Sequence, residues 1–269
     1  MHVVPARSMK AFFRLCVLVV MAGMALQLYF VVRIALMVVV DPESTAFERT
    51  EVYRVVMKTG ALKWRQSWLP YTELPDHLKR AVIASEDGSF LEHEGLDLEA
   101  LEKAWDKNIK AEQRSEKLAG QSASRLANRD STTSPARPAV RATVKPPKIV
   151  GGSTITQQLA KNLFLSGERT LLRKGQELVL TLLLEAMLDK RRILEIYLNS
   201  VEWGEGVFGA EAAAQHYYRK PAAKLSAYEA ARLAVMLPRP RYFETRPYSG
   251  YLASRASTIA ARMVGVDPP

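Results

Sequence analysis

The feature that most constrains this chain is an apolar run close to its N-terminus. Within residues 15–32 only Gln27 is strongly polar, and apolar residues resume over residues 34–40. A helix needs roughly 20 apolar residues to cross about 30 Å of hydrocarbon, and this run suffices if the Arg33 side chain reaches toward the lipid headgroups. We therefore expect a transmembrane anchor over residues 15–40.

The two flanks of this run differ in charge. Basic residues precede it and acidic residues follow it: Arg7, Lys10 and Arg14 on one side, Asp41, Glu43 and Glu48 on the other. The positive-inside rule places residues 1–14 in the cytoplasm and the rest of the chain outside the membrane. A cleaved signal peptide is the alternative, but its apolar region would span about 7–15 residues and end at an A-x-A-like site. This run is longer and has no convincing site before Asp41.

Composition restricts the chemistry without choosing a partner. The chain has 269 residues and a net charge of +10. Such a charge admits nucleic acid, anionic lipid or a phosphate-bearing substrate, and the length admits one large domain or two small ones. Cys16 is the only cysteine, which excludes an intrachain disulfide and a zinc site built from cysteines.

Beyond the anchor, helical patterns dominate. Residues 41–73 are expected to form a stalk and the start of the extracytoplasmic domain, and the alternation at residues 52–56 resembles a β-strand. Pro75 opens a helical pattern, and Asp97 is a candidate N-cap for the next helix. Two capping boxes, Thr154 with Gln157 and Ser226 with Glu229, mark two further helix starts. Additional helices are expected over residues 171–190, 193–198, 212–218 and 248–264, so this part should be mainly α.

Residues 110–148 differ in composition from their surroundings. The segment is rich in Ala, Ser, Thr, Arg and Pro, and it holds nine Lys/Arg and three Asp/Glu. Such a segment cannot bury enough apolar area to offset the entropy of ordering. We predict a flexible basic insertion, and two roles stay open for it: a passive tether, or a loose electrostatic contact with anionic headgroups.

Two adjacent acids, Glu86 and Asp87, end the helical pattern that Pro75 opens. A carboxylate held against an apolar helix end has its charged form disfavoured, which can bring a Glu into the range useful for general acid or base catalysis. His93 could orient such a carboxylate or simply pack locally. By itself, an exposed Glu-Asp pair is more often a solvated helix end.

A glycine-rich segment leads into the helix that Thr154 caps. Helix N-termini carry unpaired N–H groups and the positive end of the dipole, which suits a phosphate group. Lys161 lies two turns along, on roughly the same face as Thr154 and Gln158, where it could help to hold an anion. A well-capped structural helix is an equally good interpretation.

Arg173 and Glu177 are four residues apart and share a helix face. They form either a surface ion pair or a cation for pyrophosphate beside a second carboxylate. Glu185 lies near the same face in an apolar stretch and needs a partner. The G-x-G-x-x-G match at residues 204–209 is not a nucleotide site, because a helix precedes it and no parallel-sheet pattern surrounds it.

Taken together and in order, these segments resemble glycosyltransferase family 51, the peptidoglycan transglycosylases, over about residues 74–251 apart from the basic insertion. The matching blocks are Glu86-Asp87 with Phe90, His93 and Gly95; residues 151–162; Arg173-Lys174 with Glu177 and Glu185; residues 193–199 with Gly204 and Gly209; and residues 231–234 with 237–240. The resemblance implies a mainly α fold: a lysozyme-like glycosyltransferase domain with a membrane-contacting jaw, preceded by one N-terminal transmembrane helix. We expect this domain over residues 74–264, a tail over residues 265–269, and a monofunctional enzyme without a transpeptidase domain.

The resemblance also implies a reaction. Lipid II would be polymerised into glycan strands with inversion and release of undecaprenyl pyrophosphate. Glu86 would be the general base and Glu177 the second carboxylate. The substrate-binding residues it implies are Lys161 and Arg173 at the pyrophosphate, Thr154, Gln158 and Asn162 along the cleft, and Asp87 and His93 nearby.

Partners and location follow from the same resemblance. We expect lipid II and the growing glycan strand as ligands, and no nucleic acid. The expected location is the cell inner membrane, with the catalytic domain in the periplasm. Cell-wall synthesis or division proteins are further candidate partners. The sequence requires no cofactor and is compatible with a divalent cation, Mg or Mn, at the pyrophosphate. Two rivals stay open: a lytic enzyme of lysozyme-like fold, and a membrane scaffold without activity. In a lytic enzyme Lys161 and Arg173 would have no purpose. The presence of Glu86, Lys161, Arg173 and Glu177 argues against a scaffold without activity.

Overall fold

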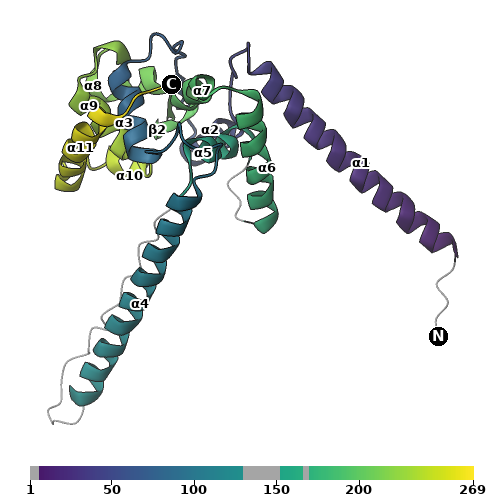
Figure 1. Cartoon of the computed structure of the whole chain (residues 1–269), viewed down its shortest axis with the longest axis horizontal. Helices are drawn as coiled ribbons and strands as arrows, with labels where there is room; N and C mark the ends of the chain where they lie inside the picture. The colour runs from purple at the N-terminus through teal and green to yellow at the C-terminus, as the bar shows by residue number, and fades with distance from the viewer. Residues whose placement is uncertain (1–5, 130–151, 166–169) are drawn as a thin grey trace. The chain divides into compact units, whose positions relative to one another are not determined.

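The computed structural model describes residues 6–129, 152–165 and 170–269 and is mainly helical (Figure 1). The helices are α1 (Ala6–Leu36), α2 (Ala46–Thr59), α3 (Asp76–Glu86), α4 (Leu98–Arg129), α5 (Ile155–Phe164), α6 (Leu171–Met187), α7 (Lys190–Ser200), α8 (Ala210–Tyr218), α9 (Ala227–Met236), α10 (Pro240–Glu244) and α11 (Gly250–Arg262). Short 3-10 turns lie at Ala222–Lys224 and Met263–Gly265. The chain divides into two compact units, Met1–Gly95 with Thr154–Pro269, and Leu96–Ser153.

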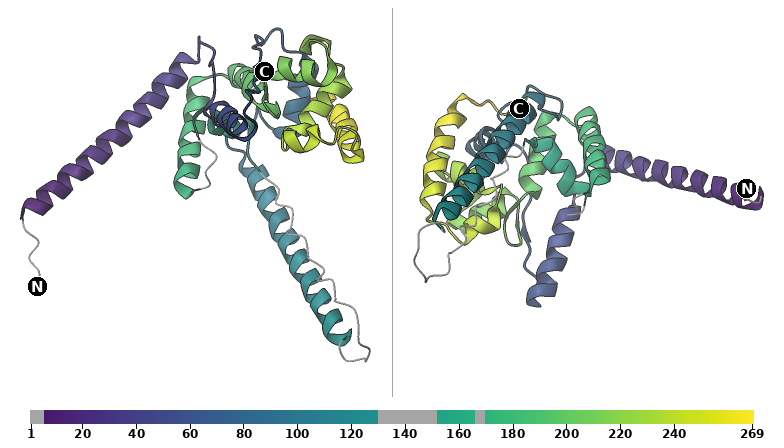
Figure 2. Two further views of the ribbon diagram at one scale, coloured as in Figure 1. Left: turned by 180° about the vertical axis from the view of Figure 1, so that it is seen from behind. Right: turned by 90° about the horizontal axis from the view of Figure 1, so that it is seen from below.

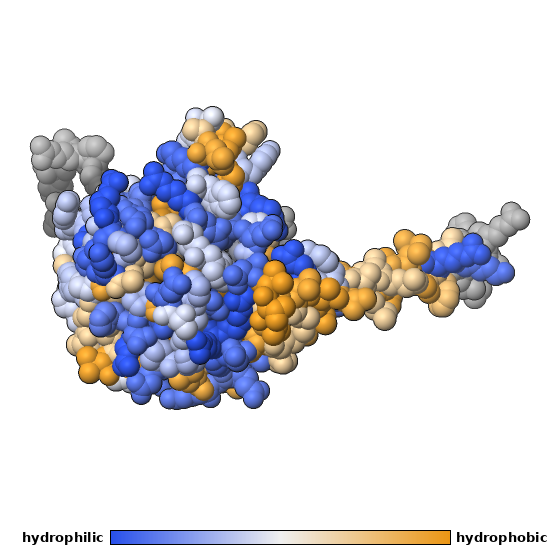
Figure 3. Space-filling model, turned by 90° about the horizontal axis from the view of Figure 1, so that it is seen from above, coloured by the Kyte–Doolittle hydropathy of each residue, from blue (hydrophilic) through white to orange (hydrophobic). Residues whose placement is uncertain are grey.

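Helix α1 is long and apolar enough to cross a membrane. The qualifying stretch, Lys10–Leu36, has a mean hydropathy of 2.4, and its apolar side chains are largely exposed along the helix surface (Figure 3). The last turns of α1 pack on the rest of the unit, where Phe30 and Ile34 are buried and the Phe30 ring centroid lies 5.3 Å from that of Phe164. Gln27, the one strongly polar residue of the run, pairs with the Gln176 side chain of α6 at 2.9 Å.

Residues 46–59 form helix α2, so the strand indicated by the alternation at residues 52–56 is wrong. A capping box begins the helix: Thr45 Oγ1 accepts from the Glu48 N–H and Glu48 Oε2 accepts from the Thr45 N–H, both at 3.0 Å. Gly60 ends it in the left-handed conformation at φ 68°. The alternation at residues 52–56 resembled a strand, but caps at both ends outweigh a pattern of only five residues.

The core of the first unit is built from two groups of packed helices. In one, α3, α9 and α11 pack on one another; in the other, α5 packs on α6, α7 and α2 (Figures 1 and 2). The helices contribute fully buried side chains at the spacing expected of amphipathic helices, namely Leu78, Val82, Leu159, Leu180, Leu184, Ile193, Leu233 and Ile259. Both capping boxes predicted from the sequence, at Thr154 and Ser226, are present. The helix expected over residues 171–190 ends at Met187, because Asp189 caps α7 through the Arg192 N–H at 2.7 Å.

A small sheet holds the G-x-G-x-x-G match. Strands β1 (Arg65–Gln66), β2 (Glu202–Gly204) and β3 (Val207–Phe208) run in the order β1-β3-β2, with β1 parallel and β2 antiparallel to β3. No pattern along the chain indicated the parallel pair, which is only two residues long. Gly206 has a φ of 73°, and a Cβ there would lie 2.3 Å from the Lys63 carbonyl oxygen. The glycines therefore serve a tight hairpin, and strands this short do not form a dinucleotide-binding βαβ unit.

The second unit contains α4, whose N-cap is Asp97 as predicted: its Oδ1 accepts from the Ala100 N–H at 2.7 Å. The flexible insertion expected from residue 110 is wrong for residues 110–129, which continue this helix. Residues 130–148 of that prediction lie outside the described residues. A segment poor in large apolar residues cannot build a core, but Ala, Glu, Lys, Arg and Gln are strong helix formers. No proline occurs in the helix to interrupt it, and residues 110–118 are mostly exposed.

Candidate active site

Glu86 is the last residue of α3 and is half-buried. Its Oε2 accepts a hydrogen bond from Gln158 Nε2 of α5 at 3.1 Å. Burial is the largest cause that raises the pKa of the Glu86 carboxyl above its usual value, while the Gln158 hydrogen bond opposes that rise. The structure thus brings together two residues that the sequence singled out separately, and it gives Glu86 the surroundings of a general base.

Tyr197 of α7 fixes the amide that contacts Glu86. The buried Tyr197 hydroxyl donates to Gln158 Oε1 at 2.9 Å. Because this bond occupies the amide oxygen, the amide nitrogen is the atom that faces Glu86. Tyr197 was not among the predicted site residues, because its place in the apolar pattern of residues 193–198 indicated only a core position. The one available signal was that a buried tyrosine hydroxyl normally requires a partner.

Asp87 ties the segment after α3 to the start of α5. It is buried, and its Oδ2 accepts from the Ile155 N–H at 2.9 Å. His93 Nε2 lies 2.9 Å from Asp87 Oδ1, and His93 Nδ1 accepts from the Gly95 N–H at 3.1 Å. An Nδ1 that accepts implies that Nε2 carries the proton and donates to Asp87. Burial is the main cause that raises the pKa of Asp87, and the bonds from His93 and Ile155 oppose it.

Protein groups take up part of the hydrogen-bonding capacity at the start of α5. Thr154 is buried; its Oγ1 accepts from the Gln157 N–H at 3.1 Å and donates to the Gly95 carbonyl at 2.7 Å. Since Asp87 takes the Ile155 N–H, two of the free N–H groups expected at this helix start already have partners. The predicted cap of this helix is therefore confirmed, and a phosphate contact at its start stays a prediction.

Cations gather around Glu177, which is buried on α6. Arg173 Nη1 lies 3.3 Å from Glu177 Oε2, and Lys174 Nζ forms a salt bridge with Glu177 Oε1. Among the described residues, the buried Nε of Arg173 has no hydrogen-bond partner. Lys174 belongs to the Arg173-Lys174 block of the resemblance but was not predicted as a site residue, although its spacing of three residues from Glu177 was an available signal.

Lys161 lies close enough to Glu86 and Glu177 to interact electrostatically with both carboxylates. The residue is exposed, yet desolvation by surrounding protein is the largest cause that lowers the pKa of its ammonium. Glu177 and, more weakly, Glu86 act against this effect, while the neighbouring cations Arg173 and Lys174 add to it. Lys161 therefore interacts electrostatically with both Glu177 and Glu86. Asn162, next to it on α5, is buried.

Glu185 lies in an apolar stretch, and its carboxylate has the hydrogen-bond partners that a buried charge requires. Its Oε1 accepts from Thr156 Oγ1 at 2.5 Å and from Lys190 Nζ at 2.8 Å. Lys190 also donates to the His93 carbonyl at 2.6 Å. All these bonds lie within the protein, so Glu185 joins α5, α6 and α7.

This arrangement can perform one kind of chemistry well. A half-buried carboxylate with a raised pKa can accept a proton from a hydroxyl group. Three cations near a single buried carboxylate, Lys161, Arg173 and Lys174 around Glu177, can stabilise developing negative charge on a phosphate leaving group.

Comparison with known proteins shows which family the chain resembles. A family model described as Transglycosylase matches residues 54–125 and 132–264. A protein of Burkholderia thailandensis is 49% identical over 248 residues, 92% of this chain and 84% of its own length. A protein of Herminiimonas arsenicoxydans is 45% identical over 260 residues, 97% of this chain and 98% of its own length. Both relatives carry the name biosynthetic peptidoglycan transglycosylase.

Proposed function

Because the chain belongs to the peptidoglycan transglycosylase family, we propose that it polymerises lipid II into glycan strands, with inversion and release of undecaprenyl pyrophosphate. The coarser assignment follows from the family directly: the protein is a glycosyltransferase of cell-wall biosynthesis. The observation that carries the finer proposal is the pairing of half-buried Glu86 with Gln158, with Lys161 in the field of both Glu86 and Glu177.

Glu86 is the base in this proposal. It accepts the proton of the acceptor sugar hydroxyl while that oxygen attacks the anomeric carbon of the donor. The bond between that carbon and the pyrophosphate oxygen breaks, and its electron pair leaves with the undecaprenyl pyrophosphate. One displacement on the face opposite the leaving group inverts the anomeric carbon. The proton on Glu86 then passes to solvent.

Lys161 and Arg173 stabilise the negative charge that develops on the pyrophosphate leaving group. The Arg173 Nε, buried and without a partner among the described residues, is a donor that a pyrophosphate oxygen can occupy. Glu177 orients Arg173 and Lys174 through its two oxygens and is itself the second carboxylate of the site. A divalent cation on the pyrophosphate stays a prediction, and turnover measured across a chelator titration tests it.

The substrate contacts expected of Asp87, His93 and Thr154 stay predictions, and in this proposal the same residues also position the site. Asp87 forms hydrogen bonds with His93 and with the Ile155 N–H, and Thr154 donates one to the Gly95 carbonyl. These bonds fix the start of α5 against the end of α3. That contact keeps Gln158 opposite Glu86. The substrate contact expected of Asn162 stays a prediction for this buried residue of α5.

The discriminating experiment compares two substrates. Lytic enzymes that hydrolyse glycan commonly use a protonated carboxylic acid and a second carboxylate at a defined separation, and a cluster of cations has no role in that reaction. Purified full-length protein in detergent should convert lipid II into polymer and leave purified glycan strands intact. Release of sugar fragments from glycan strands without polymer formation would establish the lytic rival.

Removing the Tyr197 hydroxyl should change the titration of the base. In Tyr197→Phe the Gln158 amide loses the bond that fixes its orientation, so its donation to Glu86 weakens. Because that donation lowers the pKa of Glu86, the pKa should rise further. The base works deprotonated, so the acid limb of the kcat/KM profile should move to higher pH, while the rate on the alkaline side stays within about threefold.

Tyr228→Phe is the matched control, since Tyr228 is an exposed tyrosine of α9. Its acid limb should coincide with that of the wild type. A Tyr197→Phe enzyme with an unmoved acid limb and only a lower Tm would show that Tyr197 is purely structural.

The anchor suggests a location and an orientation. Lys10 and Arg14 lie at the start of the candidate span and Asp41 follows its end. The charge bias favours a cytoplasmic N-terminus and a catalytic domain on the periplasmic side of the inner membrane. A reporter that is active only in the periplasm should be active when fused after Pro269. Full protease protection of the C-terminus in spheroplasts would contradict this orientation.

A further inference from the structure

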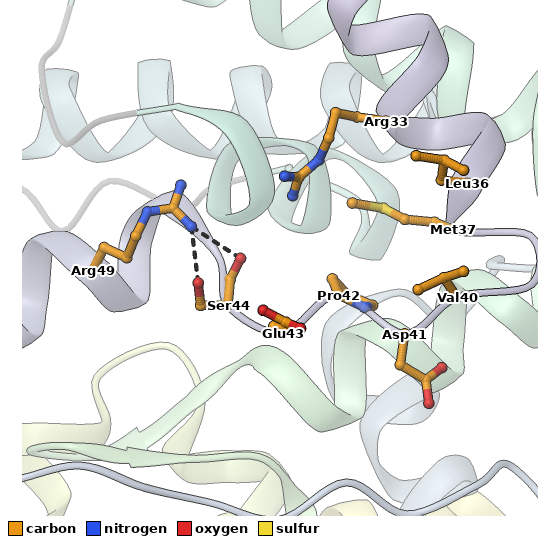
Figure 4. A pocket seen from close by; sticks show the side chains of 9 residues that line it. All are labelled: Arg33, Leu36, Met37, Val40, Asp41, Pro42, Glu43, Ser44 and Arg49. Atoms are coloured by element: carbon orange, nitrogen blue, oxygen red, sulfur yellow. Dashed lines mark hydrogen bonds between the residues drawn. The ribbon is translucent and has the colours of Figure 1, made fainter.

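A pocket lies where α1 ends and the chain turns toward α2 (Figure 4). It has a volume of about 230 Å³. Its walls combine apolar side chains, including Leu36 and Met37, with the guanidinium groups of Arg33 and Arg49. None of these residues belongs to the candidate active site. We call it the α1–α2 pocket.

Arg33 is the basic residue in the last turn of the helix that is apolar enough to span a membrane. A charge within such a helix is costly unless it reaches a partner at the interface. No salt bridge joins Arg33 to a carboxylate in the described part of the chain. A lipid phosphate at the same depth is the natural counter-ion, because guanidinium groups bind phosphate oxygens through charge-assisted hydrogen bonds.

Arg49 brings a second guanidinium to the same pocket. Its Nη1 donates to the Ser44 carbonyl at 3.1 Å and to Ser44 Oγ at 3.0 Å. These bonds hold the side chain in place and leave its other N–H groups to a ligand. In Figure 4 the guanidinium groups of Arg33 and Arg49 both point into the pocket.

The two acids of the pocket are not equivalent. Asp41 is held by Arg192 of α7, with Nη2 2.7 Å from Oδ1, and its carboxylate points away from Arg33 (Figure 4). Glu43 is exposed and forms no salt bridge with any described residue. The pocket therefore offers two guanidinium groups and one available carboxylate, close to where the candidate span ends.

Two guanidinium groups and one available carboxylate suit a ligand that carries a phosphate and a primary ammonium on one small headgroup. We propose that the α1–α2 pocket binds a zwitterionic aminophospholipid, with its phosphate on Arg33 and Arg49 and its ammonium on Glu43. A trimethylated headgroup has no N–H to donate to Glu43, and an anionic headgroup leaves Glu43 without a cation. Lipid binding is measured without turnover, so the test does not depend on the proposed polymerisation.

The experiment is a lipid titration of the full-length protein in detergent, followed by native mass spectrometry. The probes are phosphatidylethanolamine, phosphatidylcholine, phosphatidylglycerol and undecaprenyl pyrophosphate. Wild-type protein should retain phosphatidylethanolamine roughly fivefold better than the other two glycerolipids, about the effect of one well-placed charge at a membrane surface. Arg33→Gln and Arg49→Gln should each weaken that retention by about the same factor.

Glu43→Gln is the decisive variant. It should abolish the preference for phosphatidylethanolamine over phosphatidylcholine while both lipids still bind. Arg14→Gln is the control, since Arg14 lies on the same helix and outside the pocket. Thermal unfolding checks each variant, and the exposed positions of Arg49 and Glu43 make loss of folding there unexpected.

Three outcomes would overturn the proposal. The first is equal retention of all three glycerolipids by the wild type. The second is an unchanged preference in Glu43→Gln. The third is displacement of phosphatidylethanolamine by an equal concentration of undecaprenyl pyrophosphate, which would make the pocket part of the substrate path.

Discussion

Glu86→Gln is expected to reduce the rate of lipid II polymerisation by at least about 100-fold, the usual contribution of a general base. The amide has the shape of the carboxylate, and its oxygen can still accept from Gln158 Nε2, as Glu86 Oε2 does now. It cannot take up the proton of the attacking hydroxyl. The protein should therefore bind lipid II and keep its Tm while turnover is lost.

The matched control is Glu92→Gln, an exposed glutamate in the turn after α3. Its polymerisation rate should equal that of the wild type. A folded Glu86→Gln enzyme with near-normal polymer yield would remove Glu86 from the mechanism.

The second large effect is expected at the leaving group. Lys161→Ala and Arg173→Ala should each lower kcat by about 10²–10³-fold, the range found when one preorganised donor to developing charge is removed. Arg173→Ala leaves Glu177 paired with Lys174, so the buried carboxylate keeps one partner and the fold should persist. Single-turnover polymerisation of lipid II measures this loss apart from product release.

Lys224→Ala provides the control, because Lys224 is exposed on the 3-10 turn Ala222–Lys224. Its rate should not change. Rates within about twofold of the wild type for both Lys161→Ala and Arg173→Ala would indicate ordinary surface ion pairs.

Several features of this protein were encoded in short stretches of sequence. The capping boxes at Thr154 and Ser226 and the N-cap at Asp97 each depend on residues within three positions of one another. The position of Glu86 at a helix end follows from the apolar pattern that precedes it. Such signals are local, and the chain satisfies them almost independently of its tertiary structure.

Local patterns failed where two of them competed. The alternation at residues 52–56 favoured a strand, whereas the cap pair Thr45 and Glu48 favoured the helix that is present. Residues 110–129 carry few large apolar side chains for a core, a composition that predicted a flexible segment, but they form part of helix α4. Composition reports what a segment can bury, but a helix can form from backbone hydrogen bonds and helix-forming residues alone.

Only the tertiary structure decided how the site residues act. The contact of Tyr197 with Gln158 spans 39 positions, that of Gln158 with Glu86 spans 72, and that of Asp87 with Ile155 spans 68. Sequence alone determined which residue types are available and which helix carries each of them. It could not determine which hydroxyl meets which amide, because a hydrogen bond requires its donor and acceptor within about 3 Å. Packing of α3, α5 and α7 creates that proximity, and no spacing along the chain records it.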